Sequence, residues 1–357
     1  MRAGLSREFW TGRRVFVAGH TGFKGGWLVA VLGRLGAEAS GYALPPHTTP
    51  NLYGAARIDE LCRSTFGDVR DPDALTGAMQ AAEPEIVFHL AAQALVRPSL
   101  TKPVETISTN VMGTTQVLES VRATPSVKAA VIVTSDKVYD NMEWAWAYRE
   151  NDRLGGKEPY GASKACAEIV VEAYRHSFFS GKDRTTLIAT ARAGNVIGGG
   201  DWAQDRIVPD AMRAFSQGQP LLVRNPAAIR PWQHVLEPLS GYLRLAQALL
   251  DGTALPDALT FNFGPQAEDA VRVSAISDQV AARWGNGASW QQDAGYQPYE
   301  AHLLELDSAK ARACLGWAPR WRLQDALNHT VDWYKAFYAG RAMQAFSLAQ
   351  IDEYLDG

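Results

Sequence analysis

A tyrosine and a lysine are placed so that together they could remove a proton from an alcohol. Tyr160 and Lys164 lie at the start of a predicted helix, and their i, i+4 spacing puts both side chains on one face. A nearby ammonium is expected to lower the pKa of the Tyr160 phenol from its usual value of about 10, because it favours the phenolate. A phenolate can act as a general base. The same spacing also occurs in ordinary solvated helices, so other motifs must decide.

A glycine-rich turn follows the apolar run Val15–Val17, far earlier in the chain. Glycines there permit the tight turn, the approach of a pyrophosphate and the packing of the next helix, whose N–H groups can bind phosphate. A plain turn is the alternative, but the apolar helix that follows favours a dinucleotide. With the Tyr–Lys pair, the turn predicts hydride removal from a sugar-like alcohol. The candidate cofactor contacts are Gly19, Thr21, Gly22, Phe23 and Lys24.

Small and polar residues follow three predicted strands. Ligands of parallel sheets bind at the carboxyl ends of strands, so these residues are expected to share one site, although turn chemistry alone could explain them. The small residues leave room for a flat ligand, and the Ser-Asp-Lys run offers a hydroxyl, a carboxylate and an ammonium. The candidates are Leu90, Ala91, Ala92 and Gln93, then Ser135, Asp136 and Lys137, then Asn195.

Strand-like and helix-like segments alternate in the first half, which predicts a doubly wound parallel sheet of Rossmann type in an α/β protein. The expected strands are 14–18, 38–43, 85–90, 129–134 and 186–192. The expected helices are 24–35, 72–82, 104–123 and 159–179. After Gly194 the alternation breaks at Gly198–Gly200, which suggests a flexible junction. We expect a dinucleotide domain at about 1–194 and a smaller mixed α/β substrate lobe at 195–357.

Composition excludes several functional classes. The 357 residues carry a net charge of −3 without a basic tract, so neither nucleic acid nor an anionic membrane is expected as a partner. The three cysteines are widely separated, which fits a reducing compartment and predicts neither a disulfide framework nor a metal site. No apolar signal core or membrane-length run is present, so a cytoplasmic location is expected.

These motifs occur in the order found in extended short-chain dehydrogenases/reductases that act on nucleotide sugars, and the chain resembles that superfamily. The stretches GHTGFKG, TSDKVYDN, RAGNVIGGGDWAQDRIVPD and RNPAAIRPWQHVLEPLSGYL are similar to the CDP-glucose 4,6-dehydratase family. The resemblance implies a lyase of deoxysugar biosynthesis with NAD as cofactor and CDP-glucose as substrate. It also implies a homodimer, with the predicted helices 104–123 and 159–179 forming a four-helix interface.

The resemblance also assigns roles to the candidate residues. Ser135 would hold the sugar hydroxyl while Tyr160, assisted by Lys164, takes its proton and hydride leaves C4. Asp136 would protonate the departing 6-hydroxyl. Relatives acting on TDP- and GDP-sugars usually have Glu after this Asp as base for the C5 proton, and here Lys137 stands in its place. Lys137 is then either a deprotonated base, an electrostatic stabiliser of the enolate, or only a partner of Asp136.

Two further parts of the site concern the adenosine half of the cofactor. The second predicted strand ends at Gly41–Leu44 without the carboxylate that usually holds the adenosine ribose, so NAD rather than NADP rests on the resemblance. His47 or Asn51 could substitute, though both are more simply loop residues. Asp68 and Val69 match the adenine-edge position of the superfamily.

The substrate side is assigned by residue chemistry. Asn195 and Arg206 are the candidate diphosphate contacts, with Arg230 and His234 from the RPWQH segment beside them. Arginine suits a bidentate phosphate grip, although each could be a structural ion-pair partner.

Three alternatives stay open. A nucleotide-sugar 4-epimerase would keep Tyr160, Lys164 and Ser135 but would have no use for the acid Asp136. A 4,6-dehydratase acting on another nucleotide sugar would share all of these residues. A non-catalytic NAD-binding regulator often lacks the tyrosine or the lysine, and both are present here.

Overall fold

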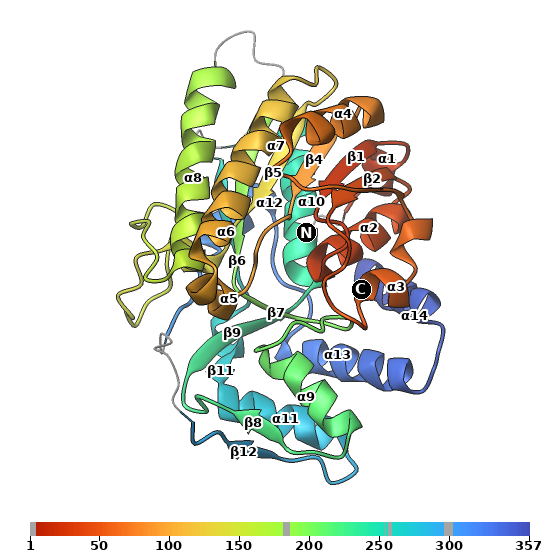
Figure 1. Cartoon of the computed structure of the whole chain (residues 1–357), viewed down its shortest axis with the longest axis vertical. Coiled ribbons are helices and arrows are strands. Elements are labelled where there is room, and N and C mark those ends of the chain that lie inside the picture. The colour runs from red at the N-terminus through yellow and green to blue at the C-terminus, as the bar shows by residue number, and fades with distance from the viewer. Residues whose placement is uncertain (1–4, 181–185, 254, 256–258, 296–302) are drawn as a thin grey trace.

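The computed structural model describes residues 5–180, 186–253, 255, 259–295 and 303–357. Seven parallel strands form the centre of the larger lobe, in the order β10-β6-β5-β4-β1-β2-β3 (Figure 1). In chain order they are β1 Arg14–Ala18, β2 Glu38–Ala43, β3 Arg63–Phe66, β4 Ile86–His89, β5 Ala129–Val133, β6 Leu187–Ala193 and β10 Thr260–Phe263. The five predicted strands and the doubly wound parallel sheet are confirmed, with ends shifted by a residue or less.

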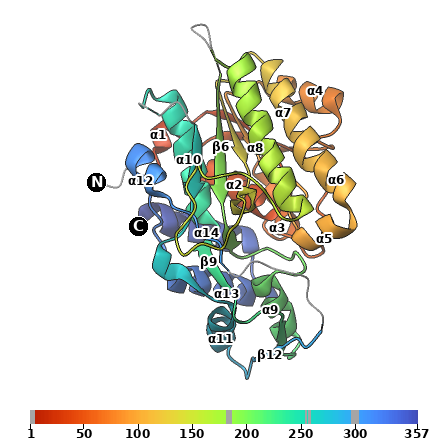
Figure 2. The same ribbon diagram turned by 90° about the vertical axis from the view of Figure 1, so that its left-hand side faces the viewer.

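Helices cover both faces of this sheet, and Figures 1 and 2 show α7 and α8 side by side on one of them. The helices are α1 Arg7–Trp10, α2 Phe23–Arg34, α3 Leu52–Ala55, α4 Pro72–Ala82, α5 Val96–Thr101, α6 Pro103–Ile107, α7 Gly113–Arg122, α8 Pro159–Phe178, α9 Ile207–Ser216, α10 Leu236–Leu250, α11 Val273–Trp284, α12 Ala309–Leu315, α13 Leu323–Tyr338 and α14 Met343–Asp356. The predicted helix 104–123 is divided, because a π-helical turn, η2 Ser108–Met112, joins α6 to α7. Short 3₁₀ turns are η1 Ile58–Glu60, η3 Asp136–Val138 and η4 Ala267–Asp269.

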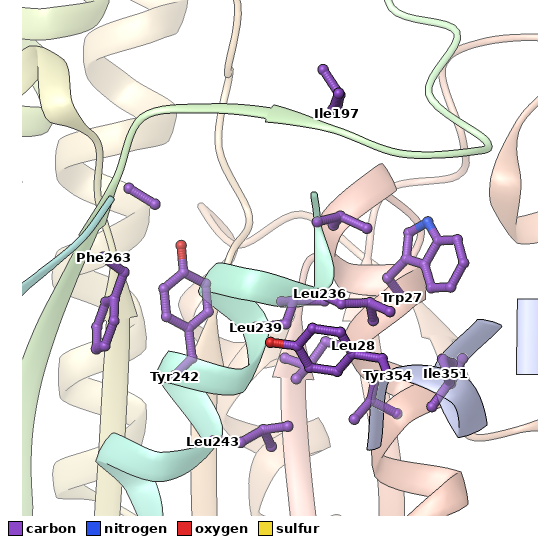
Figure 3. Close-up of a cluster of buried hydrophobic side chains, with 14 of the residues drawn as sticks. Trp27, Leu28, Ile197, Leu236, Leu239, Tyr242, Leu243, Phe263, Ile351 and Tyr354 are labelled. Atoms are coloured by element: carbon purple, nitrogen blue, oxygen red, sulfur yellow. The ribbon is translucent and has the colours of Figure 1, made fainter. Parts of the chain in front are cut away.

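Alternate residues of the strands feed two separate cores, as expected for a sheet buried on both faces. Val15 and Val17 of β1 pack with α2 and α10, whereas Phe16 of the same strand packs with α4 and α7. Figure 3 shows the first of these cores, where Leu28 of α2 meets Leu239 of α10. The two packed layers hold the carboxyl ends of the strands in fixed positions.

The smaller lobe is built on two short sheets, and Figure 1 shows it below the main sheet. One sheet has the order β11-β9-β7, and the other pairs β12 with β8. The strands are β7 Asn195–Ile197, β8 Leu221–Val223, β9 Ile229–His234, β11 Ala270–Arg272 and β12 Trp290–Gln292. The segment after residue 194 contributes to both lobes, since α10 and β10 pack within the larger one.

The expected flexible junction at Gly198–Gly200 is wrong. A Cβ on Gly199 would lie 2.0 Å from the Trp333 ring, and one on Gly200, whose φ is +84°, would lie 2.5 Å from Leu52. The Gly199 carbonyl also accepts a hydrogen bond from Trp27 Nε1 at 2.9 Å. Glycine is therefore required here by close packing between the lobes.

Candidate active site

A cleft of about 1760 Å³ runs along the carboxyl edge of the main sheet. It lies over β1 and β4, where the strand order reverses, the usual ligand position in a doubly wound sheet. Nineteen of the twenty residues proposed from the sequence line it, and only His234 does not. They are Gly19, Thr21, Gly22, Phe23, Lys24, Asp68, Val69, Leu90, Ala91, Ala92, Gln93, Ser135, Asp136, Lys137, Tyr160, Lys164, Asn195, Arg206 and Arg230.

The glycine-rich turn is shaped by close backbone approaches. Gly19 has φ +102°, and a Cβ there would lie 2.5 Å from the backbone nitrogen of Ala91. A Cβ on Gly25 would lie 2.0 Å from the Gly19 carbonyl oxygen. Gly22 is the N-cap residue of α2 and has no side chain that could cap the helix. The first N–H groups of α2, which border the cleft, therefore receive no cap from a side chain and can bind a ligand. These features fit the diphosphate of a dinucleotide.

The region next to β2 offers hydrogen-bonding groups but no carboxylate at the strand end. Thr21 Oγ1 donates to the Leu44 carbonyl at 2.8 Å, which ties the glycine-rich turn to the end of β2. Asp68 pairs with Arg70, whose hydrogen bonds lower the pKa of that carboxyl. Asn51 caps α3 by accepting from Gly54 N at 2.7 Å, whereas His47 lines the cleft.

The turn after β5 brings a hydroxyl and a carboxylate together. Ser135 Oγ donates to Asp136 Oδ1 at 3.0 Å and accepts from the backbone N–H of Lys137 at 3.2 Å. Asp136 Oδ2 lies against Gly194, where a Cβ would stand 2.9 Å away, so a larger residue would displace the carboxylate. Lys137 also lines the cleft, and the described residues contain no ion pair between it and Asp136.

Tyr160 reaches the same place from α8. Glu158 caps this helix by accepting from the backbone N–H groups of Tyr160 at 2.7 Å and Gly161 at 2.9 Å. Burial raises the pKa of the Tyr160 phenol to about 12, while a hydrogen bond with Ser135 opposes that rise. The net shift is opposite in direction to the lowering expected from Lys164, because burial is the largest cause.

Lys164 is hydrogen-bonded to the main sheet. Its Nζ donates to the Val133 carbonyl at 3.2 Å, and burial lowers its pKa to about 8, with the charge of Glu168 opposing the shift. Glu168 itself is buried in an ion pair with Arg192, with an Nη2–Oε2 distance of 2.9 Å. This ion pair joins β6 to α8, the helix that carries Tyr160 and Lys164.

Two cations, Lys24 and Arg206, also line the cleft. Burial lowers the pKa of Lys24 to about 8, and the charge of Arg206 lowers it further while that of Asp136 raises it. Arg206 Nη1 donates to Asp201 Oδ2 at 2.9 Å. The two cations suit a ligand phosphate placed between the lobes. Asp201 was missed from the sequence, since a lone aspartate in a loop carries no distinctive pattern.

The other substrate candidates differ in what their side chains do. Arg230 Nη1 donates to the Ile229 carbonyl at 2.9 Å, and the residue faces the cleft. The Gln93 amide nitrogen donates to the Leu95 carbonyl within its own loop and to Thr106 Oγ1 of α6. His234 is fully buried against Trp27 and Trp321. The predicted substrate contact by His234 is therefore wrong, because inward-facing positions of β9 pack on aromatic side chains.

Asn110 is a positioning residue that the sequence analysis missed. It lies in the π-helical turn η2, and its Nδ2 donates to Ser163 Oγ at 2.8 Å and to the Gln93 carbonyl at 3.0 Å. It thereby connects the loop after β4 to α8, the helix of Tyr160. Such π turns are frequent at functional sites, but no composition signal marks them in a sequence.

Comparison with known proteins agrees with this arrangement. The GDP-mannose 4,6 dehydratase family model matches residues 16–330. The CDP-glucose 4,6-dehydratase of Salmonella typhimurium is 49% identical over 355 residues, covering 98% of each chain. A dTDP-glucose 4,6-dehydratase of Xanthomonas campestris pv. campestris is 26% identical and covers 89% of this chain and 92% of its own.

Solved structures share the fold. The UDP-glucose 4-epimerase of Thermotoga maritima with UDP-glucose has a TM-score of 0.78 at 20% identity, covering 90% of this chain and 99% of its own. The dTDP-glucose 4,6-dehydratase of Bacillus anthracis in complex with NAD has a TM-score of 0.74 at 19% identity, covering 91% and 97%. The family match, the near full-length relative and the site together place the chain: it belongs to the nucleotide-sugar 4,6-dehydratase family of extended short-chain dehydrogenases/reductases.

Proposed function

We propose that the protein is an NAD-dependent lyase that converts CDP-glucose to CDP-4-keto-6-deoxyglucose. The observation that carries the proposal is the meeting of Tyr160, Ser135 and Asp136 in one cleft, in a chain 49% identical to a CDP-glucose 4,6-dehydratase over 98% of its length. A base and an acid placed together suit a reaction that both oxidises and dehydrates. An epimerase would need only the base.

The residues have separate tasks in this reaction. Tyr160 takes the proton of the C4 hydroxyl, which Ser135 orients, and Asp136 protonates the C6 hydroxyl as it leaves. NAD, when bound, accepts hydride from C4 and later returns it to C6. The ketone formed at C4 makes the C5 proton acidic, and Lys137 on the same turn, in its amine form, takes that proton and returns it to C5 when hydride reaches C6.

Cofactor and substrate would lie in different parts of the cleft. The N-terminus of α2 and the turn at Gly19–Gly22 would hold the NAD diphosphate, with Asp68 and Val69 at the adenine edge. The CDP-glucose diphosphate would lie between the lobes on Arg206, Arg230 and Asn195.

We also infer a homodimer formed through α6, η2 and α8. These elements carry exposed apolar side chains although they belong to the well-packed larger lobe. Val104 is 80% exposed, Ile169 58% and Met112 49%. Exposed apolar side chains that gather on one side of a protein are typical of interfaces. Figure 1 shows α6 and α8 on the same side of the lobe.

A panel of nucleotide sugars with detection by mass spectrometry tests the function. With catalytic NAD, CDP-glucose should give a product lighter by one water, over many turnovers and without net NADH. A product of unchanged mass would indicate an epimerase. Stoichiometric accumulation of NADH would indicate a simple dehydrogenase, and dehydration of another nucleotide sugar in preference to CDP-glucose would reassign the base.

A further inference from the structure

A buried carboxylate of α8 is hydrogen-bonded to two strands of the main sheet. Arg192 of β6 donates to both oxygens of Glu168, from Nε to Oε1 at 3.0 Å and from Nη2 to Oε2 at 2.9 Å. Thr190 of β6 donates to Oε2 at 2.9 Å, and Thr134, the residue after β5, donates to Oε1. All four residues are buried. One carboxylate therefore joins α8 to both β5 and β6.

The same ion pair reaches the chain beyond the β5 turn, the name used here for residues 135–137. Arg192 Nη1 donates to the Tyr139 hydroxyl at 2.8 Å, and the guanidinium carbon lies 5.0 Å from the centre of the Tyr139 ring. The Tyr139 hydroxyl in turn donates to Asn262 Oδ1 of β10 at 2.8 Å. Because Thr134 precedes the β5 turn and Tyr139 follows it, the ion pair is bonded to the chain on both sides of the turn.

The β5 turn is packed between α8 and the segment that follows β6. On the side of α8, a Cβ on Gly161 would lie 2.7 Å from the Lys137 carbonyl oxygen. On the other side, a Cβ on Gly194 would lie 2.9 Å from Asp136 Oδ2. Both contacts are made at glycines, where a larger residue would not fit. The turn therefore fits only while α8 and the end of β6 keep their present separation.

A buried ion pair is a better positioning device than a source of stability. Removing two charges from water offsets most of their mutual attraction, so an apolar pair of similar volume would stabilise the fold equally well. The forked hydrogen bonds between Arg192 and Glu168 instead fix the orientation and the distance of the two groups. Neither side chain lines the cleft, so neither touches a ligand there.

We propose that the Glu168–Arg192 ion pair is a positioning device for the reaction, which holds the β5 turn in register with the start of α8. It thereby places Ser135, Asp136 and Lys137 against the sugar while Tyr160 faces the same sugar from the helix. The inference rests on the proposed function. A displacement of about 1 Å between reacting groups can cost about 10²-fold in rate, so a device of this kind matters to turnover.

The test changes two threonines that donate to the same carboxylate. Replacing Glu168 or Arg192 alone would leave a buried charge unpaired and would destabilise the fold. Thr134→Val and Thr190→Val each remove one hydroxyl donor to Glu168 and keep the shape of the side chain. Only Thr134 borders the β5 turn. Thr190→Val is therefore the matched control for lost stability.

We expect Thr134→Val to lower kcat for CDP-glucose by about 10–10²-fold, because the β5 turn is displaced relative to Tyr160. The KM for CDP-glucose and the Kd of NAD should stay unchanged, since the phosphate contacts lie elsewhere. Thr134→Ser, which keeps the hydroxyl, should restore kcat. Thr190→Val should keep the wild-type kcat although its thermal midpoint falls at least as far.

Two further measurements separate positioning from a general loss of stability. Tyr139→Phe removes the hydroxyl bonded to Arg192 on the other side of the β5 turn, and should lower kcat in the same way as Thr134→Val. With deuterium at C4 of the sugar, the isotope effect on kcat should increase in both variants, because hydride transfer from a misplaced C4 becomes the slowest step. Thr190→Val should show the wild-type isotope effect.

Three outcomes would overturn the positioning role. Wild-type kcat in Thr134→Val would show that the turn does not depend on the ion pair. Equal losses of kcat in Thr134→Val and Thr190→Val would show that the pair serves only the stability of the fold. Because Thr134 borders the cleft, weaker binding of NAD or CDP-glucose with an unchanged kcat would mean that its hydroxyl contacts a ligand. A wild-type protein inactive on CDP-glucose would contradict the proposed function, and the same variants would then be compared on the nucleotide sugar that it converts.

Discussion

At the scale of single residues, the site depends on which ionisation states burial permits. Tyr160, Lys164 and Lys24 all line the cleft. Burial raises the pKa of the tyrosine and lowers the pKa of both lysines, so it favours the neutral form of each side chain. A neutral phenol is a poor base, and a lysine with a pKa of about 8 is only mostly charged at neutral pH. Tyr160 can therefore act as a base only where a nearby positive charge favours its phenolate, and the charge of Arg206 opposes burial in that direction.

Replacing Tyr160 with Phe should remove the base and leave the cleft otherwise intact. We expect kcat to fall by about 10²–10⁴-fold with little change in CDP-glucose affinity, because the ring still fills its place and the phosphate contacts are elsewhere. Steady-state kinetics and equilibrium binding of CDP-glucose measure the two quantities. Unchanged turnover would remove Tyr160 from the mechanism.

Asp136→Asn should stop the reaction between oxidation and elimination. The amide cannot supply a proton to the departing C6 hydroxyl, whereas Tyr160, Lys164 and Ser135, which serve the first hydride transfer, are unaltered. Bound NADH should therefore accumulate on mixing with CDP-glucose, more so towards alkaline pH, and little dehydrated product should form. Stopped-flow absorbance and mass detection report the two species. Normal product formation by this variant would exclude Asp136 as the acid.

The buried hydroxyl of Tyr242, close to the site, should lower the free energy of unfolding. Tyr242 is fully buried, and its hydroxyl has no hydrogen-bond partner among the described residues. Figure 3 shows it beside Phe263 in the core. Tyr242→Phe should raise the free energy of unfolding by about 1 kcal/mol, because an unsatisfied polar group is removed.

The matched control is Tyr354→Phe. The Tyr354 hydroxyl is also buried, but it donates to Glu237 Oε2 at 2.9 Å and lies 3.0 Å from Ser240 Oγ. This variant should lose about 1–3 kcal/mol, because it leaves a buried carboxylate short of a donor. Urea unfolding measures both, and a loss of stability in Tyr242→Phe would show that its hydroxyl has a partner in solution.

At the scale of elements, the sequence analysis predicted those strands, helices and turns that apolar periodicity or glycine spacing marks. Five strands were predicted correctly this way, and the candidate site residues that follow them were proposed this way, because β-branched runs and polar strand ends are local signals. β3 was missed because all four of its residues are exposed, so it has no apolar alternation. β10 was missed because it joins β6 from far along the chain, a pairing set by tertiary packing. Asn110 and Asp201 act through hydrogen bonds that no local pattern reveals.

The connection between β7 and α9 gives a test at this scale. Gly199→Ala would place a methyl group 2.0 Å from the Trp333 ring, so α13 must shift. We expect a loss of about 1–3 kcal/mol of stability, as for other overpacked cores. The control is Gly77→Ala in exposed helical surface of α4, where nothing lies within 4 Å, and it should gain about 0.5–1 kcal/mol. Thermal unfolding compares them, and equal effects would mean that the Gly199 contact is easily relieved.

At the scale of the whole molecule, residues of both lobes line the cleft, and one hydrophobic core joins the two lobes. No described helix is both long and apolar enough to cross a membrane. Exposed apolar side chains lie on α6 and α8. They lie on the outer side of the helices whose inner sides hold Tyr160 and Asn110. A partner packed there would stiffen the elements that position the base.

This arrangement predicts that breaking the dimer weakens catalysis without touching the cleft. Ile169→Glu places a charge at a 58% exposed apolar position of α8 and should give a monomer, because an interface cannot bury an unpaired carboxylate. Leu222→Glu, at a 55% exposed position of β8 in the other lobe, is the matched control and should leave the oligomeric state unchanged. Light scattering at micromolar concentration measures the mass of each. We expect the Ile169 variant to retain its fold by circular dichroism and to lose turnover, since α8 is then free to move Tyr160 relative to Ser135. A wild-type protein that is already monomeric would contradict the interface, and a monomeric Ile169 variant with full activity would show that the dimer does not support the site.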